Sequence, residues 1–189
     1  MGAEVTQVYR GEQVLRGFDH DIQAFFAQET RKLRRYTEHQ RGYDVGPLIN
    51  PAKPDYQLLG VYDPALTPVM AQALQQLGVK AAWVVHGSGC DEIALHGLTN
   101  VSAVSNTGAI EHFELTPADF GLPQISLSEL TGGSPADNAK ATLAILQGTG
   151  KAAHNQAVAA NVAAMLHITG KSTDLKQQTA AVLEHLASG

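Results

Sequence analysis

From residue 46 onward, short apolar runs alternate with longer stretches in which apolar residues recur every three or four positions. This is the pattern of strands alternating with helices. The apolar run at residues 58–62 predicts a strand, and residues 64–77 predict a helix that is capped by Asp63 and has a proline at its first position. Residues 82–85, Ala-Trp-Val-Val, predict a second, buried strand. Strand, helix and strand in succession indicate a parallel βαβ unit.

Three more apolar runs predict strands that extend this sheet, at residues 93–96, 101–105 and 109–115. The last two are separated by Asn106-Thr107-Gly108, a strong hairpin turn signal, so they should pair antiparallel. We therefore expect an α/β fold with a partial mixed sheet flanked by helices.

Helical patterns dominate the rest of the chain. The predicted segments are a helical turn at 116–119 and helices over residues 135–148, 151–168 and 173–186. Ser134 precedes a proline and should cap the first long helix, while Ser172 or Thr173 should cap the last.

Residues 1–45 differ in composition from the rest of the chain, because they are rich in Arg, Gln, Glu and aromatic residues. Asp19 is placed to cap a helix over residues 20–40, whose C-terminal part carries the basic run Arg31-Lys32-Leu33-Arg34-Arg35. Basic side chains near a helix C-terminus favour a solvated helix end over a phosphate-binding or partner-binding face. We therefore divide the chain into an N-terminal segment, 1–45, and an α/β domain, 46–189.

Composition narrows the function classes. Of 189 residues, 44% are hydrophobic and 16% charged, an ordinary globular balance, and the net charge of −5 argues against a nucleic-acid surface. No apolar run approaches the roughly 20 residues of a membrane-spanning helix. The single cysteine, Cys90, excludes an internal disulfide and favours a reducing compartment, so we expect a cytoplasmic protein that acts on small molecules.

The strongest candidate chemistry lies just after the buried strand at 82–85. There the loop Gly87-Ser88-Gly89 is followed by two adjacent carboxylates, Asp91 and Glu92. Ligands of open α/β sheets bind beyond the carboxyl ends of strands, and adjacent carboxylates gain most when Mg²⁺ lies between them and an anionic substrate. Taken alone, such a pair is more often a solvated turn.

Other catalytic motifs fail on spacing. Ser88 lacks the glycines that a nucleophile elbow needs, since His86 and Cys90 occupy those positions. Gly148-Thr149-Gly150-Lys151 resembles a P-loop only in part and is interpreted as a turn between helices. Cys90 lies next to two carboxylates that disfavour its thiolate, and the eight histidines lack zinc-ligand spacing.

Five segments together resemble the anthranilate phosphoribosyltransferase family. Each is modest evidence, but all five occur in the family's order, from Gly46 to the end of the chain. The segments are Gly46-Pro47-Leu48-Ile49-Asn50-Pro51, Gln57-Leu58-Leu59-Gly60-Val61-Tyr62, Val85-His86-Gly87 with Asp91-Glu92-Ile93-Ala94-Leu95-His96, Leu130-Thr131-Gly132-Gly133-Ser134-Pro135, and Ala157-Val158-Ala159-Ala160-Asn161.

The resemblance implies a function in tryptophan biosynthesis. The family transfers phosphoribosyl from phosphoribosyl pyrophosphate to anthranilate, with Mg²⁺ on the diphosphate. By position, Asp91 and Glu92 match the family's acidic pair that holds one Mg²⁺, and His86, Gly87 and Ser88 would shape the loop that presents them. The resemblance also implies the large domain of the nucleoside phosphorylase and phosphoribosyltransferase type of fold. It assigns no catalytic side chain and no anthranilate contact.

The chain also departs from the family. The Gly-Thr-Gly-Gly-Asp phosphate loop, which precedes the equivalent of Gly46 in the family, does not occur here. A rival interpretation is therefore a folded, non-catalytic fragment that serves as an interaction module, and a third is an unrelated Mg²⁺-dependent α/β enzyme. An incomplete sheet should leave one edge open, or covered by the helix at 20–40, and an open edge favours a homodimer.

Overall fold

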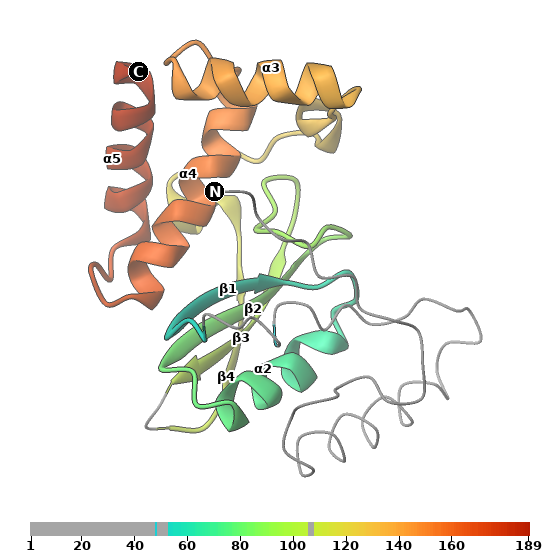
Figure 1. Ribbon diagram of the computed structural model, residues 1–189, viewed down its shortest axis with the longest axis vertical. Coiled ribbons are helices and arrows are strands. Elements are labelled where there is room, and N and C mark those ends of the chain that lie inside the picture. Colours follow the sequence, from blue (N-terminus) through green and yellow to red (C-terminus); the bar gives the residue numbers. More distant parts are fainter. Residues whose placement is uncertain (1–47, 49–52, 106–107) are drawn as a thin grey trace, which may run out of the picture.

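A computed structural model describes residue 48 and residues 53–105 and 108–189 (Figure 1). Within them, one four-stranded mixed sheet has the order β1-β2-β3-β4. The strands are β1 (Tyr56–Gly60), β2 (Ala81–Gly87), β3 (Thr99–Ser105) and β4 (Glu111–Leu115). The predicted helix over residues 20–40, most of the Gly46 to Pro51 loop, and Asn106 and Thr107 of the hairpin turn lie outside the described residues.

The predicted βαβ unit is confirmed. Strand β1 pairs parallel with β2 in the register Leu58 to Trp83, and α2 (Leu66–Gln76) connects them. The helix begins two residues later than predicted, because Pro64 lies in the turn before it. The N-cap is Ala65, so the predicted cap Asp63 and the predicted proline at the first helical position are wrong. In that turn the Asp63 carboxylate accepts a hydrogen bond from the Ala65 N–H at 2.9 Å.

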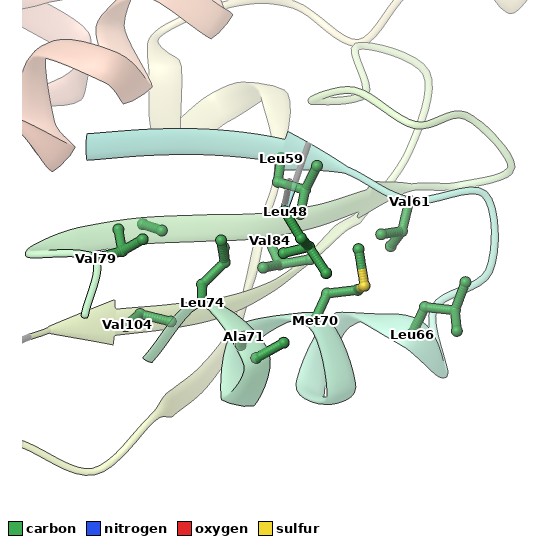
Figure 2. Close-up of a cluster of buried hydrophobic side chains, with 12 residues drawn as sticks. Leu48, Leu59, Val61, Leu66, Met70, Ala71, Leu74, Val79, Val84 and Val104 are labelled. Carbon is green, nitrogen blue, oxygen red and sulfur yellow. The ribbon is translucent and has the colours of Figure 1, made fainter. Parts of the chain in front are cut away.

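A hydrophobic core fills the space between the sheet and α2. Figure 2 shows side chains of the sheet, among them Leu59 and Val84, directed toward Met70 and Leu74 of α2. Leu74 and Val84 are completely buried. Because successive residues of a strand point to opposite faces, Trp83 and Val85 belong to a second core on the other face of the sheet, where α4 packs.

Strands β3 and β4 form the predicted antiparallel hairpin, with Val101 opposite Phe113. Strand β3 also pairs antiparallel with β2, so the sheet is mixed. This arrangement places β1 and β4 at the two edges of the sheet among the described residues.

The strand predicted at residues 93–96 is wrong. Ile93, Ala94 and Leu95 are buried, but they lie in a loop outside the sheet ladder. Their backbone groups find other partners: the Ala94 N–H donates to Thr99 Oγ1 at 2.9 Å, and the Leu95 carbonyl accepts from the Ile125 N–H at 2.9 Å. The apolar run at residues 93–96 therefore indicates burial and not pairing within a sheet.

The helices beyond the sheet follow the predictions closely. After the 3₁₀ turns η2 (Pro117–Phe120) and η3 (Leu127–Leu130) come α3 (Pro135–Leu146), α4 (Ala152–Ile168) and α5 (Leu175–Ser188). Helix α4 packs on the sheet through Ala160, Ala163 and Ala164, and α5 packs on α4 (Figure 1). The cap of α5 is Asp174, whose carboxylate accepts from the Gln177 N–H, and not Ser172 or Thr173.

Helix α3 contrasts with its neighbours, because none of its residues is buried. Its cap is the predicted Ser134. Among the described residues, no helix is both long enough and apolar enough to span a bilayer.

Candidate metal and diphosphate site

The loop after β2 begins with a tight backbone turn. The Gly87 N–H donates to the Cys90 carbonyl at 2.9 Å, and the Cys90 N–H donates back to the Gly87 carbonyl at 3.1 Å. Ser88, at the tip, has φ of 48°, a left-handed conformation that non-glycine residues adopt rarely. This turn redirects the chain at the carboxyl end of β2, immediately before Asp91 and Glu92.

His86 anchors the turn from inside the protein. Its side chain is buried, with Nδ1 at 2.8 Å from the Val61 carbonyl and Nε2 at 3.2 Å from the Gly89 N–H. Because the Gly89 N–H donates, Nε2 is the acceptor, and Nδ1 carries the proton that is donated to Val61. The neutral ring therefore ties the segment after β1 to the loop after β2.

Two further side chains hold the same loop from outside. The Ser88 hydroxyl donates to the Leu98 carbonyl at 2.8 Å, and His96 Nε2 lies 3.1 Å from the Ser88 carbonyl. The His96 carbonyl in turn accepts from Gln124 Nε2 at 2.9 Å. The sequence pattern singled out neither contact, and Gln124 lies 28 residues from His96 along the chain.

Glycine at two positions lets the strands approach the acidic pair closely. A Cβ on Gly60 would overlap the backbone carbonyl of Asp91, and a Cβ on Gly87 would overlap the carbonyl of Glu92 and the backbone of Ala94. Any larger residue would push the loop away from the sheet. The predicted segment His86, Gly87 and Ser88 thus lies against the backbone that carries Asp91 and Glu92.

Asp91 and Glu92 have exposed side chains and line one groove. This feature, the β1–α4 groove, has a volume of about 690 Å³ and runs between β1 and α4. Asn161 of α4, Thr169 at the C-terminal cap of that helix and Lys171 also line it. The sequence pattern did not indicate Thr169 or Lys171 as part of a site. Among the described residues, neither carboxylate makes an ion pair or a side-chain hydrogen bond.

Cys90 is an unreactive neighbour of the site. Burial raises the pKa of its thiol, and the charges of Glu92 and Asp91 raise it further. The thiol donates to the Gly87 carbonyl at 2.9 Å. The sequence interpretation named the charges as the cause, but burial is the larger effect.

The donor set fits a hydrated hard cation. No group of three His, Cys, Asp or Glu side chains in the described part of the chain is placed to hold a metal. Two exposed carboxylates that have no competing partner in the described part of the chain suit Mg²⁺, which keeps much of its water shell and binds through one or two carboxylates together with substrate phosphates. Tight zinc sites, in contrast, use three or four protein ligands.

Comparisons with known proteins point in one direction. Residues 28–189 match the family model described as glycosyl transferase family, a/b domain, so the match begins before Gly46. Anthranilate phosphoribosyltransferase of Shewanella sp. (strain ANA-3) is 52% identical over 145 residues, which are 77% of this chain and 42% of that protein. The Haemophilus influenzae enzyme is 48% identical over 178 residues, 94% of this chain and 50% of that protein. The chain thus spans about half the length of these relatives.

Solved structures agree with the fold. Anthranilate phosphoribosyltransferase from Thermus thermophilus superposes with a TM-score of 0.70 at 36% identity, over 85% of this chain and 47% of that one. The Saccharomyces cerevisiae enzyme in complex with PRPP and Mg gives a TM-score of 0.67 at 25% identity, again over 85% of this chain and 47% of the other. The expected large-domain architecture is therefore confirmed.

Proposed function

Because this chain belongs to the glycosyl transferase family through its α/β domain, we propose that it acts in the transfer of phosphoribosyl from phosphoribosyl pyrophosphate to anthranilate, in tryptophan biosynthesis. One observation carries the proposal. Asp91 and Glu92 line an open groove at the carboxyl end of β2, in a chain about half of whose residues are identical to those of anthranilate phosphoribosyltransferases over the matched length.

In this proposal, Asp91 and Glu92 hold the Mg²⁺–diphosphate end of the substrate. When bound, Mg²⁺ supplies positive charge that stabilises the negative charge developing on the leaving pyrophosphate. The two carboxylates attract and orient the hydrated cation. No further protein ligand is needed, because substrate phosphates and water complete the coordination shell of the cation. Lys171 and Asn161 line the same groove, where Lys171 can pair with the anionic substrate; the Asn161 amide donates one hydrogen bond to the Ala157 carbonyl at 2.9 Å.

His86, Gly87 and Ser88 act through the loop and not on the substrate. The His86 ring fixes the turn at Gly89, the absent side chain of Gly87 lets the carbonyl of Glu92 approach, and Ser88 joins the turn to Leu98. Because the loop backbone is already fixed, only the two carboxylate side chains have to be ordered when the metal complex binds, which favours affinity. We assign the activity to the cytoplasm, in keeping with the single cysteine of the chain.

The experiment follows the fluorescence of anthranilate, which disappears when the amine is phosphoribosylated. Protein, anthranilate and phosphoribosyl pyrophosphate are mixed with and without Mg²⁺, using wild type, Glu92→Gln and the control Glu111→Gln. Glu111 is an exposed carboxylate on β4, outside the groove. We expect a Mg²⁺-dependent loss of fluorescence with wild type and the control, and at least a tenfold slower loss with Glu92→Gln.

The rival function is a non-catalytic interaction module. Two observations favour this rival. Among the described residues, the two carboxylates are the whole candidate ligand set for Mg²⁺, and α3 has no buried residue. If the fluorescence of anthranilate stays constant at high protein concentration, this chain alone does not catalyse the transfer. The function as a non-catalytic interaction module then takes the place of the proposed one.

A further inference from the structure

A second cavity lies on the face of the sheet that α2 covers, away from the β1–α4 groove. This feature, the β4 cavity, has a volume of about 280 Å³ and opens between the start of α2 and strand β4. Asn100, Ser102, His112 and Glu114 line it. In the register of β3 and β4, Ser102 lies opposite His112 and Asn100 lies opposite Glu114. The four side chains therefore form two neighbouring cross-strand pairs on one face of the sheet.

A chain of hydrogen bonds beside the β4 cavity fixes which nitrogen of His112 carries the proton. The Thr67 hydroxyl donates to the Pro64 carbonyl at 3.0 Å, because a carbonyl oxygen only accepts. The Ser102 hydroxyl therefore donates to Thr67 Oγ1, at 3.1 Å. Its single proton is then used, so the 2.9 Å contact between Ser102 Oγ and His112 Nδ1 needs a proton on Nδ1. In the neutral ring, Nε2 keeps its lone pair.

The direction of this chain excludes a serine nucleophile and favours a metal ligand. An activated serine directs its proton at the histidine that acts as base, whereas the Ser102 proton is directed at Thr67. Metal-binding histidines, in contrast, donate one ring N–H to an outer partner and bind the ion through the other nitrogen. Ser102 is such an outer partner for His112, because its oxygen accepts from Nδ1.

Two oxygen donors stand beside the imidazole. Glu114 follows His112 by two residues on β4, so both side chains project from the same face of the strand, and Asn100 lies across from Glu114 on β3. In the part of the chain that the structure describes, the side chains of Glu114 and Asn100 make no hydrogen bond or ion pair. An imidazole nitrogen together with carboxylate and amide oxygens is a mixed donor set that suits divalent transition-metal ions.

We propose that the β4 cavity binds a divalent transition-metal ion such as Zn²⁺ through His112 Nε2, the Glu114 carboxylate and the Asn100 amide oxygen. Water completes the coordination shell. The bound ion links β4 to β3 and stabilises the folded hairpin, because it binds the folded chain and not the unfolded one. The site is independent of the proposed function, since neither Asp91 nor Glu92 lines this cavity.

The test is calorimetric titration of zinc chloride into the protein in excess Mg²⁺. Mg²⁺ competes for carboxylate pairs but poorly for an imidazole nitrogen, so it leaves the β4 cavity to Zn²⁺. The cavity variants are His112→Asn and Glu114→Gln. The matched controls are His185→Asn, at an exposed position on α5, and Glu111→Gln, on β4 but facing the other side of the sheet. Circular dichroism of each variant checks that it folds.

We expect one Zn²⁺ site that wild type and both controls share, with an affinity at least tenfold weaker in His112→Asn and in Glu114→Gln. In wild type, Zn²⁺ should slow amide hydrogen exchange at residues 111–115 several-fold. No saturable binding to wild type, wild-type affinity in both cavity variants, or an equal loss of affinity in either control would overturn the proposal. Exchange at β4 that does not change with Zn²⁺ would also overturn it. Anthranilate and diphosphate are absent from these measurements, so their failure is separable from failure of the proposed function.

Discussion

At the scale of single residues, the acidic pair is placed by groups other than its own side chains. Asp91 and Glu92 are exposed and their side chains bond to no described residue, so they do not fix the loop themselves. The loop is fixed by the His86 ring, by the Gly87 to Cys90 turn and by the Ser88 hydroxyl. Order at the site therefore comes from hydrogen bonds to backbone groups, and the one between the His86 ring and the Val61 carbonyl is buried and thus costly to leave unmade.

His86→Phe tests this directly. Phenylalanine keeps a planar, somewhat larger ring but cannot donate to the Val61 carbonyl or accept from the Gly89 N–H. We expect a loss of about 2 kcal/mol in the free energy of unfolding, because two hydrogen bonds disappear and the Val61 carbonyl stays buried. Urea unfolding measures it. His185→Phe, at an exposed position on α5, is the control. Equal stability of the two variants would mean that His86 does not anchor the loop.

The sequence predicted much of this residue-level picture. It placed Asp91 and Glu92 beyond a strand end, and the preceding glycine-rich loop as their support. It did not reveal the partners of His86, because a hydrogen bond from a side chain to a backbone 25 residues away leaves no local pattern. The same holds for Gln124, which bonds to the His96 carbonyl across 28 residues.

At the scale of elements, prediction from the sequence succeeded where a local sequence pattern is compatible with only one structure. Ser134 before a proline predicted the start of α3, and apolar runs predicted β1 to β4. It failed at residues 93–96, where burial without ladder pairing imitates a strand, and at the cap of α5. Ser172, Thr173 and Asp174 are all good caps, and choosing Asp174 depends on the tertiary path of the chain.

The 3₁₀ turn η2 supports a pH prediction. Two hydrogen bonds from Thr116, through its N–H and its hydroxyl, lower the pKa of Asp119. A carboxyl whose pKa is lower in the folded state adds stability above its unfolded pKa, and this stability is lost as pH falls through the folded pKa. We expect Asp119→Asn to cost about 1 kcal/mol at pH 7, a typical cap contribution. The difference from wild type should vanish well below pH 4. Urea unfolding of wild type and variant at pH 7 and pH 2.5 measures the difference in their free energy of unfolding at each pH. An equal difference at the two pH values would contradict the prediction.

Helix α3 supports a prediction about local stability. Ser134 and Asp137 cap it reciprocally, with the Ser134 hydroxyl 2.6 Å from the Asp137 carboxylate, and no residue of the helix is buried. Ser134→Ala should cost about 1 kcal/mol of helix stability and leave global unfolding unchanged, because α3 opens on its own. Amide exchange should accelerate several-fold in residues 135–146 alone. Uniform acceleration through the sheet and α4 would show that α3 is coupled to the core.

At the scale of the whole molecule, the chain places its acidic pair beside one edge of the sheet. It spans about half the length of its relatives, one edge of its sheet is unpaired among the described residues, and its acidic pair opens into the groove beside that edge. The sequence predicted one edge that is open or covered by the helix at 20–40. It could not predict that the edge and the acidic pair share one groove, since this depends on where α4 packs. The division at residues 45 and 46 stays a prediction; the family match begins at residue 28.

The central claim is that Asp91 and Glu92 hold a Mg²⁺–diphosphate complex. With only two carboxylates as protein ligands, affinity for free Mg²⁺ should be weak and should rise when diphosphate bridges the metal. Asp91→Asn removes one ligand and also relieves repulsion within the empty pair, so the fold should stay intact or become slightly more stable.

Calorimetric titration of pyrophosphate into wild type, Asp91→Asn and the control Glu111→Gln, with and without Mg²⁺, is the direct measurement. We predict binding heat for wild type and the control only with Mg²⁺ present, and none for Asp91→Asn under either condition. Equal binding by wild type and Asp91→Asn would contradict the claim and leave the pair as a solvated turn.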